Sequence, residues 1–156
     1  MNSDENYINQ AISEAILNID NGGGPFGAII VYNGEIISKG VNTVTIDNDP
    51  TAHAEINAIR NASKLLGKFD LSGCSLYSSC EPCPMCLSAI YWARIDKVYY
   101  ASTREDAHNA GFDDQFIYFE LDKPIKDRKI PFENIKRIDA NIIFEKWNKK
   151  IDKTPY

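Results

Sequence analysis

Two short segments of the chain each place potential metal ligands at the start of a predicted helix. Thr51-Ala52-His53-Ala54-Glu55 opens a helix expected over about 52–66, and Cys83-Pro84-Met85-Cys86 opens one expected to run to about residue 93. Proline suits the first position of a helix, which makes Cys83 the flanking residue. The histidine and the two cysteines can share one ion only if the two helix starts meet. This requirement constrains the fold more than any other feature of the sequence.

The apolar pattern predicts alternating strands and helices. Ala28-Ile29-Ile30-Val31 lacks intervening polar residues, which indicates a strand covered on both faces. Asn33-Gly34 supplies the positive φ angles of a two-residue hairpin turn. Helices are expected at 5–20, 52–66, 84–93, 104–109, from about 113 and around 143–151, and strands at 26–32, 35–41, 74–79, 97–101 and 135–138. The predicted fold class is α/β, a three-layer α/β/α sandwich with a central mixed sheet of about five strands, in a single domain over residues 1–156.

Two polar segments are interpreted as connections. Gly22-Gly23-Gly24 is followed neither by a Gly-x-Gly-x-x-Gly pattern nor by Lys-Ser/Thr, so a flexible helix-to-strand connection is favoured over a phosphate-binding loop. Residues 42–50 are expected to form a polar loop.

Composition excludes several classes of function. A net charge of −5 and the lack of a Lys/Arg cluster argue against a surface built to hold nucleic-acid backbones. The acidic N-terminal residues do not resemble a secretory signal, and the apolar run at 28–32 is far too short to span a bilayer. Three of the four cysteines crowd into residues 80–86, which fits a metal site in a reducing compartment better than a disulfide framework. We therefore expect a cytoplasmic protein without a membrane or nucleic-acid partner.

The cysteine pair has more than one interpretation. Cys83 and Cys86 alone are equally typical of a redox Cys-x-x-Cys and of a zinc site, and His53 shifts the balance toward metal. Two cysteines and one histidine match a catalytic zinc ion whose fourth position stays open, so one Zn²⁺ per subunit is expected. Cys80 is the rival ligand: a fourth protein ligand would close the site and make it structural. Cys74 is expected to be buried in a strand.

Glu55 lies two residues beyond His53 and is not expected to bind the ion. With Thr51 as the predicted N-cap, Glu55 falls one position beyond the capping-box site, so capping does not explain it. A carboxylate there can take a proton from a zinc-bound water, whose pKa falls to about 7, and pass it to a ring nitrogen and a departing amine. The alternative is an ordinary glutamate on a helix surface.

A family resemblance rests on these motifs and several others. The chain resembles the cytidine deaminase-like superfamily of zinc deaminases, whose signature combines His-x-Glu with Pro-Cys-x-x-Cys. Within that superfamily it is most similar to the bacterial guanine deaminases, over essentially its whole length. The matching segments are 24–28, 49–55, 81–86, 89–94, 110–114 with 116–118, and the terminal Tyr156.

This resemblance implies hydrolytic deamination of guanine to xanthine and ammonia, with roles for individual residues. Asn42 and Phe26 would bind the purine, the backbone amide near Ala54 would hold the attacking oxygen, and Asp114 would contact the guanine edge and assist proton transfer. Tyr156 would close the site. Four of these residues have ordinary alternatives: Asn42 as a turn residue, Phe26 as a core aromatic ring, Asp113 or Asp114 as a helix cap, and Tyr156 as a frayed terminus.

The resemblance also implies partners and leaves other functions open. A small purine base would be the substrate, in a homodimer whose C-terminal segments, about 130–156, are exchanged between subunits. Adenosine deamination in tRNA, or deamination of cytosine or another amino-heterocycle, would use the same zinc motifs. A structural zinc domain that mediates contacts is the non-enzymatic alternative.

Overall fold

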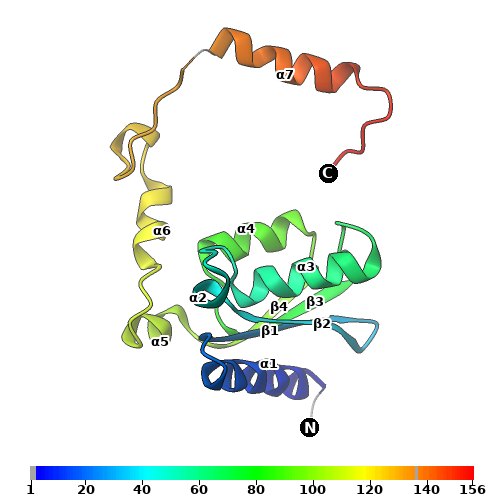
Figure 1. Cartoon of the computed structure of the whole chain (residues 1–156), viewed down its shortest axis with the longest axis vertical. Helices are drawn as coiled ribbons and strands as arrows, with labels where there is room; N and C mark the ends of the chain where they lie inside the picture. Colours follow the sequence, from blue (N-terminus) through cyan, green and yellow to red (C-terminus); the bar gives the residue numbers. More distant parts are fainter. Residues whose placement is uncertain (1–2, 136) are drawn as a thin grey trace. The chain divides into compact units, whose positions relative to one another are not determined.

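Four strands form one mixed sheet in the order β2-β1-β3-β4 (Figure 1). The strands are β1 (Gly24–Tyr32), β2 (Glu35–Asn42), β3 (Cys74–Cys80) and β4 (Lys97–Ser102). β1 pairs antiparallel with both β2 and β3, and β3 pairs parallel with β4. The computed structural model describes residues 3–135 and 137–156. The sheet is mixed and central as predicted, but within these residues it has four strands rather than five.

Helices cover both faces of the sheet, which confirms the three-layer sandwich (Figure 1). α1 (Ser3–Asp20) lies on one face, where Ile29, Val31 and Tyr77 form a buried cluster. α3 (Ala54–Leu66) and α4 (Pro84–Trp92) lie on the other face, over the larger core. The run at 28–31 is buried on both faces, as its lack of polar residues predicted. Burial of this apolar surface is the main source of stability of the layers.

Two glycines allow the helices to approach the sheet closely. A Cβ atom at Gly40 of β2 would lie 2.2 Å from the carbonyl oxygen of Ala54 and 2.3 Å from the backbone nitrogen of Ala58, both in α3. A Cβ atom at Gly27 of β1 would lie 2.4 Å from the carbonyl oxygen of Ala11 in α1. Backbone therefore packs against backbone on both faces, which only glycine permits.

The hairpin and the remaining helices match the sequence pattern in part. Asn33 and Gly34 have φ angles of 51° and 79°, as a two-residue turn requires. α5 (Arg104–Asn109) forms where expected, and α6 (Gln115–Asp122) begins near the predicted start. The polar loop over 42–50 contains a short helix that was not predicted, α2 (Val44–Asp47).

The predicted edge strand at 135–138 is not formed. Ile135 lies in coil, α7 (Arg137–Lys149) begins two residues later, and Lys136 lies outside the described residues. A run of four residues is too short for apolar spacing to separate a strand from the start of a helix.

The chain divides into two units, Met1–Gln115 and Phe116–Tyr156. The first holds the sheet and its covering helices. The second consists of most of α6, the 3-10 turn η1 (Ile125–Asp127) and α7, and it exposes many large apolar side chains, among them Phe119, Phe144 and Trp147. Among the described residues, no helix combines the length and the apolar character needed to cross a bilayer.

The contact at Gly40 predicts a large loss of stability on substitution. Gly40→Ala should lower the free energy of unfolding by about 3 kcal/mol or more, because the new methyl group forces α3 off the sheet. Gly67→Ala is the matched control: Gly67 has a φ of +64° and no atom within 4 Å of its Cβ position. It should lose only about 1–2 kcal/mol from backbone strain. Equal losses in urea unfolding would contradict the close-approach argument.

Candidate metal centre

His53 is the N-cap residue of α3, and its side chain makes no hydrogen bond to the end of its own helix. Its backbone is extended, with φ −72° and ψ 158°, so its side chain projects from the end of the helix. The predicted N-cap, Thr51, is wrong by two residues. The backbone N–H and the hydroxyl of Thr51 both donate to Oδ1 of Asp49, at 2.8 and 2.7 Å, and this local turn takes the residue out of the helix.

The two cysteines come from the start of α4. Cys83 is the N-cap, with φ −66° and ψ 169°, and Pro84 occupies the first helical position, as predicted. Cys86 follows within the first turn and is fully buried. The unpaired N–H groups and the positive end of the helix dipole at this terminus favour thiolates.

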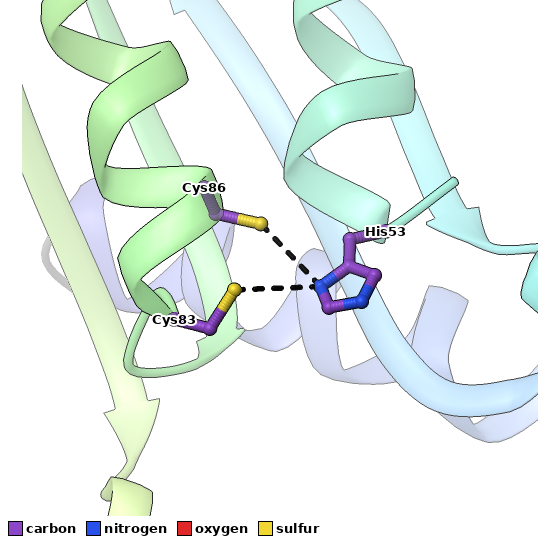
Figure 2. Close-up of side chains that lie close together, drawn as sticks. All are labelled: His53, Cys83 and Cys86. Carbon is purple, nitrogen blue, oxygen red and sulfur yellow. Dashed lines mark hydrogen bonds between the residues drawn. The ribbon is translucent and has the colours of Figure 1, made fainter. Parts of the chain in front are cut away.

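The three side chains converge on one point (Figure 2). Nδ1 of His53 lies 3.6 Å from Sγ of Cys83 and 3.5 Å from Sγ of Cys86. A tetrahedral zinc ion with typical Zn–S and Zn–N bonds would separate sulfur and nitrogen ligands by about 3.6 Å. The donor atoms and their spacing therefore fit Zn²⁺ with three protein ligands.

The cysteine pair is electrostatically prepared for a cation. A hydrogen bond from Cys86, together with His53 nearby, lowers the pKa of Cys83 to about 4. The same bond to Cys83, reinforced by burial and by Glu55, raises the pKa of Cys86. A separate hydrogen bond, between the ring of His53 and Sγ of Cys83, raises the pKa of His53. Cys83 is thus a thiolate, and a bound cation would displace the proton that Cys86 retains.

Glu55 lies beside the three ligands without joining them. Its side chain is buried, and Oε2 accepts a hydrogen bond from Sγ of Cys86 at 3.4 Å. Burial raises the pKa of this carboxyl group, and the negative charge of Cys83 adds to the effect. A buried carboxyl with a raised pKa next to a metal site is suited to accept and return a proton. The alternative of a surface glutamate is wrong, because the residue is only 6% exposed.

Cys80 and Cys74 do not belong to the ligand group found among the described residues. Sγ of Cys80 lies 3.5 Å from the carbonyl oxygen of Thr103, and burial raises its pKa to about 11. Cys74 is fully buried in β3, as expected. The fourth position of the centre is therefore not taken by the rival cysteine.

The remaining candidate residues lie in different settings. Asn42 is buried at the end of β2, and Ala54 is buried in the first turn of α3. Phe26 packs edge-to-face with Phe112 at 4.8 Å, and both rings line a cavity of about 340 Å³. Tyr156 belongs to the second unit, where its ring lies 6.5 Å from that of Trp147.

Asp114 carries the one buried carboxylate oxygen that has no hydrogen-bond partner among the described residues. Burial raises the pKa of its carboxyl group, and the charge of Cys83 raises it further. An unpaired buried acceptor is costly, so a ligand group is the expected partner.

Two asparagines for which the sequence predicted no role, Asn18 and Asn57, form hydrogen bonds around Asn42 at the end of β2. Asn18 is only 4% exposed, and it shares the buried side of α1 with Ala11 and Ala15. A polar residue in step with that apolar stripe was the available signal. Asn57 of α3 also donates to the residues on either side of Asn42, to the carbonyl oxygen of Val41 and to the hydroxyl group of Thr43.

Comparison with known proteins agrees with this geometry. Residues 1–102 match the family described as the cytidine and deoxycytidylate deaminase zinc-binding region. The chain belongs to this family. Its zinc-binding character accords with the His-Cys-Cys group, so the cofactor of this deaminase is zinc.

Individual relatives cover most of the chain. It is 51% identical to guanine deaminase of Bacillus subtilis (strain 168), over 97% of this chain and 98% of the relative, whose crystal structure superposes with a TM-score of 0.95. It is 37% identical to the tRNA-specific adenosine deaminase of Aquifex aeolicus (strain VF5), over 94% and 95% of the two chains. A structure of NE0047 in complex with 2,6-diaminopurine superposes with a TM-score of 0.69 at 33% identity. The match covers 71% of this chain and 62% of the NE0047 chain.

The ligand geometry predicts which cysteines retain zinc. Purified protein should contain about one zinc ion per chain by elemental analysis. Cys83→Ser and Cys86→Ser should each lose most of it, because a serine hydroxyl is a poor replacement for a thiolate. Cys80→Ser, the matched control three residues away, should keep it. Loss of zinc in the control variant alone would reassign the centre.

Proposed function

We propose that the protein catalyses the zinc-dependent hydrolytic deamination of guanine to xanthine and ammonia. The observation that carries the reaction type is the buried carboxyl group of Glu55 beside the His53, Cys83 and Cys86 ligands. The substrate rests on the relative from Bacillus subtilis, which acts on guanine and matches nearly the whole chain.

Glu55 moves the protons of this reaction. Bound zinc supplies a Lewis acid that lowers the pKa of water to about 7 and so provides a nucleophile near neutral pH. Glu55 accepts the first proton that the water loses and donates it to the ring nitrogen beside the reacting carbon. It then moves the second proton of the water from the added oxygen to the amine, which leaves as ammonia while the carbon–oxygen bond becomes the new carbonyl group. The raised pKa of its carboxyl group suits both halves of this cycle.

Residues around the centre bind and orient the base. Asn42 is assigned to the purine edge and Phe26 to the face of the ring, where its packing against Phe112 fixes its orientation. We assign the amide of Ala54, in the first turn of α3, to the attacking oxygen. Asp114 offers its unpaired oxygen to donor groups of guanine and assists proton transfer. A small polar base buried in this way needs a partner for each polar group.

We assign the closure of the site to Tyr156 from a second subunit of a homodimer. The unit Phe116–Tyr156 supports this exchange, because its described residues expose large apolar side chains and include none of the buried hydrophobic residues. We place the enzyme in the cytoplasm, since its cysteines are free and the zinc ligands must stay reduced.

Ammonia release from a panel of bases tests the proposal. Zinc-loaded protein should release ammonia from guanine at a rate well above that from cytosine, adenine, adenosine or tRNA. Glu55→Gln should lower kcat by about 10²–10⁴-fold, because the general acid–base is lost. Its zinc content should stay unchanged.

Two outcomes would contradict the proposal. Equal rates for Glu55→Gln and the unmodified protein would remove Glu55 from the mechanism. Preference for tRNA, with affinity that falls steeply as salt rises, would favour the tRNA-specific activity of the Aquifex relative. Glu105→Gln is the matched control, since Glu105 is exposed in α5 and should leave the rate unchanged.

A complementation experiment tests the exchanged tail. One variant carries Glu55→Gln and keeps Tyr156; the other keeps Glu55 and lacks Tyr156. Each alone should be nearly inactive. If tails are exchanged, unfolding and refolding the two together should restore activity, because mixed dimers contain one site with Glu55 from one chain and Tyr156 from the other. Activity no higher than the sum of the separate variants would show that the tail acts within its own chain or not at all.

A further inference from the structure

Asn18 ties three parts of the first unit together through its side-chain amide. Nδ2 donates to the carbonyl oxygens of Gly24 and Asn42, both at 2.8 Å. Both acceptors are carbonyl groups, so chemistry fixes which end of the amide faces them. The backbone oxygen of Asn18 also accepts from the N–H of Gly23 at 2.9 Å. The end of α1 is thereby fastened to the end of β2.

This tie replaces strand pairing that is interrupted at the same place. Gly24 and Asn42 are register partners, but the ladder between β1 and β2 is irregular from Gly24 to Gly27. Pro25 lies in the interruption and has no N–H to donate. The Asn18 amide therefore provides hydrogen bonds to both members of an isolated terminal pair.

The glycines before β1 make room for the two asparagine side chains. A Cβ atom at Gly23 would lie 2.3 Å from Nδ2 of Asn18, and one at Gly24 would lie 2.8 Å from Oδ1 of Asn42. The connection was expected to be flexible. It is instead closely packed, and two of its three glycines serve that packing.

A second asparagine holds the segment from the opposite side. Nδ2 of Asn57 donates to the carbonyl oxygen of Val41 at 2.9 Å and lies 3.0 Å from Oγ1 of Thr43. The N–H of Thr43 donates to the carbonyl oxygen of Ala52 at 2.9 Å. Asn42 is thus flanked by fixed residues on both sides.

The side chain of Asn42 is itself oriented. Its Oδ1 accepts from the N–H of Val44 at 3.3 Å. Among residues 3–135 and 137–156, no hydrogen bond donated by its Nδ2 is found. The fixed carboxamide therefore presents a donor, which suits an acceptor atom on the edge of a purine.

We infer that Asn18 is a positioning residue for substrate recognition, which acts by fixing the backbone of Asn42 so that its Nδ2 meets an acceptor of the bound base. This inference rests on the proposed function. The site it supports is built at the end of β2, on a different element from the metal ligands at the starts of α3 and α4, so its loss should affect substrate binding more than the chemical step.

Asn18→Asp is the direct test. The carboxylate would face two carbonyl oxygens with no proton between them, which displaces Asn42. We expect KM for guanine to rise about tenfold or more, with kcat within about threefold, because two hydrogen bonds, one buried and one partly buried, are lost. Zinc content should not change. Asn18→Ala removes the donor without adding charge, and it should raise KM in the same direction if the aspartate variant folds poorly.

Asn61→Asp is the matched control. Asn61 also donates through Nδ2 to β2 backbone, to the carbonyl oxygen of Lys39 at 2.9 Å, but Asn61 is exposed and its acceptor Lys39 lies three residues before Asn42. The same chemical change there should leave KM unchanged. An equal rise in both variants would mean that any disturbance of β2 weakens binding, and the specific role of Asn18 would be overturned.

A double-mutant cycle separates positioning from general stability. In protein that already carries Asn42→Ala, Asn18→Asp should change KM less than about twofold, because no carboxamide remains to be displaced. Additive losses would show that Asn18 acts independently of Asn42 and would overturn the inference.

The position of Asn42 can also be followed without substrate. The side-chain amide resonance of Asn42 in ¹⁵N-labelled protein should shift or broaden in Asn18→Asp and stay in place in Asn61→Asp. An unchanged resonance in Asn18→Asp overturns the inference even if guanine proves not to be the substrate. Lack of guanine turnover in unmodified protein, with the resonance shifted as expected, would count against the proposed function alone.

Discussion

The meeting of two helix N-termini at one end of the sheet is the constraint on which the rest of the structure depends. His53 and Cys83 are both N-caps with extended backbone, and neither side chain caps its own helix. Their side chains are therefore free to face each other, and the helix ends stabilise thiolate charge. α3 can reach this position only because Gly40 lets its backbone lie directly on β2. The metal centre thus depends on close backbone packing at Ala54, the residue that follows His53.

Burial of Glu55 follows from the same arrangement. A residue two positions past the N-cap of α3 faces the space between the helices, and there the carboxyl group loses most of its contact with water. Desolvation raises its pKa, while Cys86 supplies its hydrogen bond. A bound cation favours the ionised form of a nearby carboxylate, so metal and burial act on this pKa in opposite directions. In the proposed mechanism, that balance allows the Glu55 carboxyl group both to take and to return a proton.

The parts of the fold that sequence predicted are those set by local signals. Pro84 fixes the start of α4, Asn33-Gly34 fixes the hairpin, and an uninterrupted apolar run identifies β1. Two predictions were wrong for different reasons. Thr51 is not the N-cap of α3 because its hydroxyl group donates to Asp49 instead. Residues 135–138 were too few for their apolar spacing to distinguish a strand from the start of a helix. The metal ligands were predictable because the ion requires particular side chains at particular spacings. Asn18 was not assigned, because its partners lie 6 and 24 residues away and only the fold reveals them.

Under the proposed function, metal chemistry and base recognition are encoded differently in this chain. Metal chemistry depends on two short motifs at the N-termini of two helices that lie side by side. A guanine deaminase and a tRNA-specific adenosine deaminase are both similar to this chain. Base recognition uses backbone position at the end of β2, held by asparagines from α1 and α3. The two are joined by one short link, because the N–H of Thr43 bonds the carbonyl oxygen of Ala52, next to His53. The proposed recognition site and the metal centre come from different elements, so we expect a change in how Asn18 holds the end of β2 to alter the binding of the base more than the positions of the metal ligands.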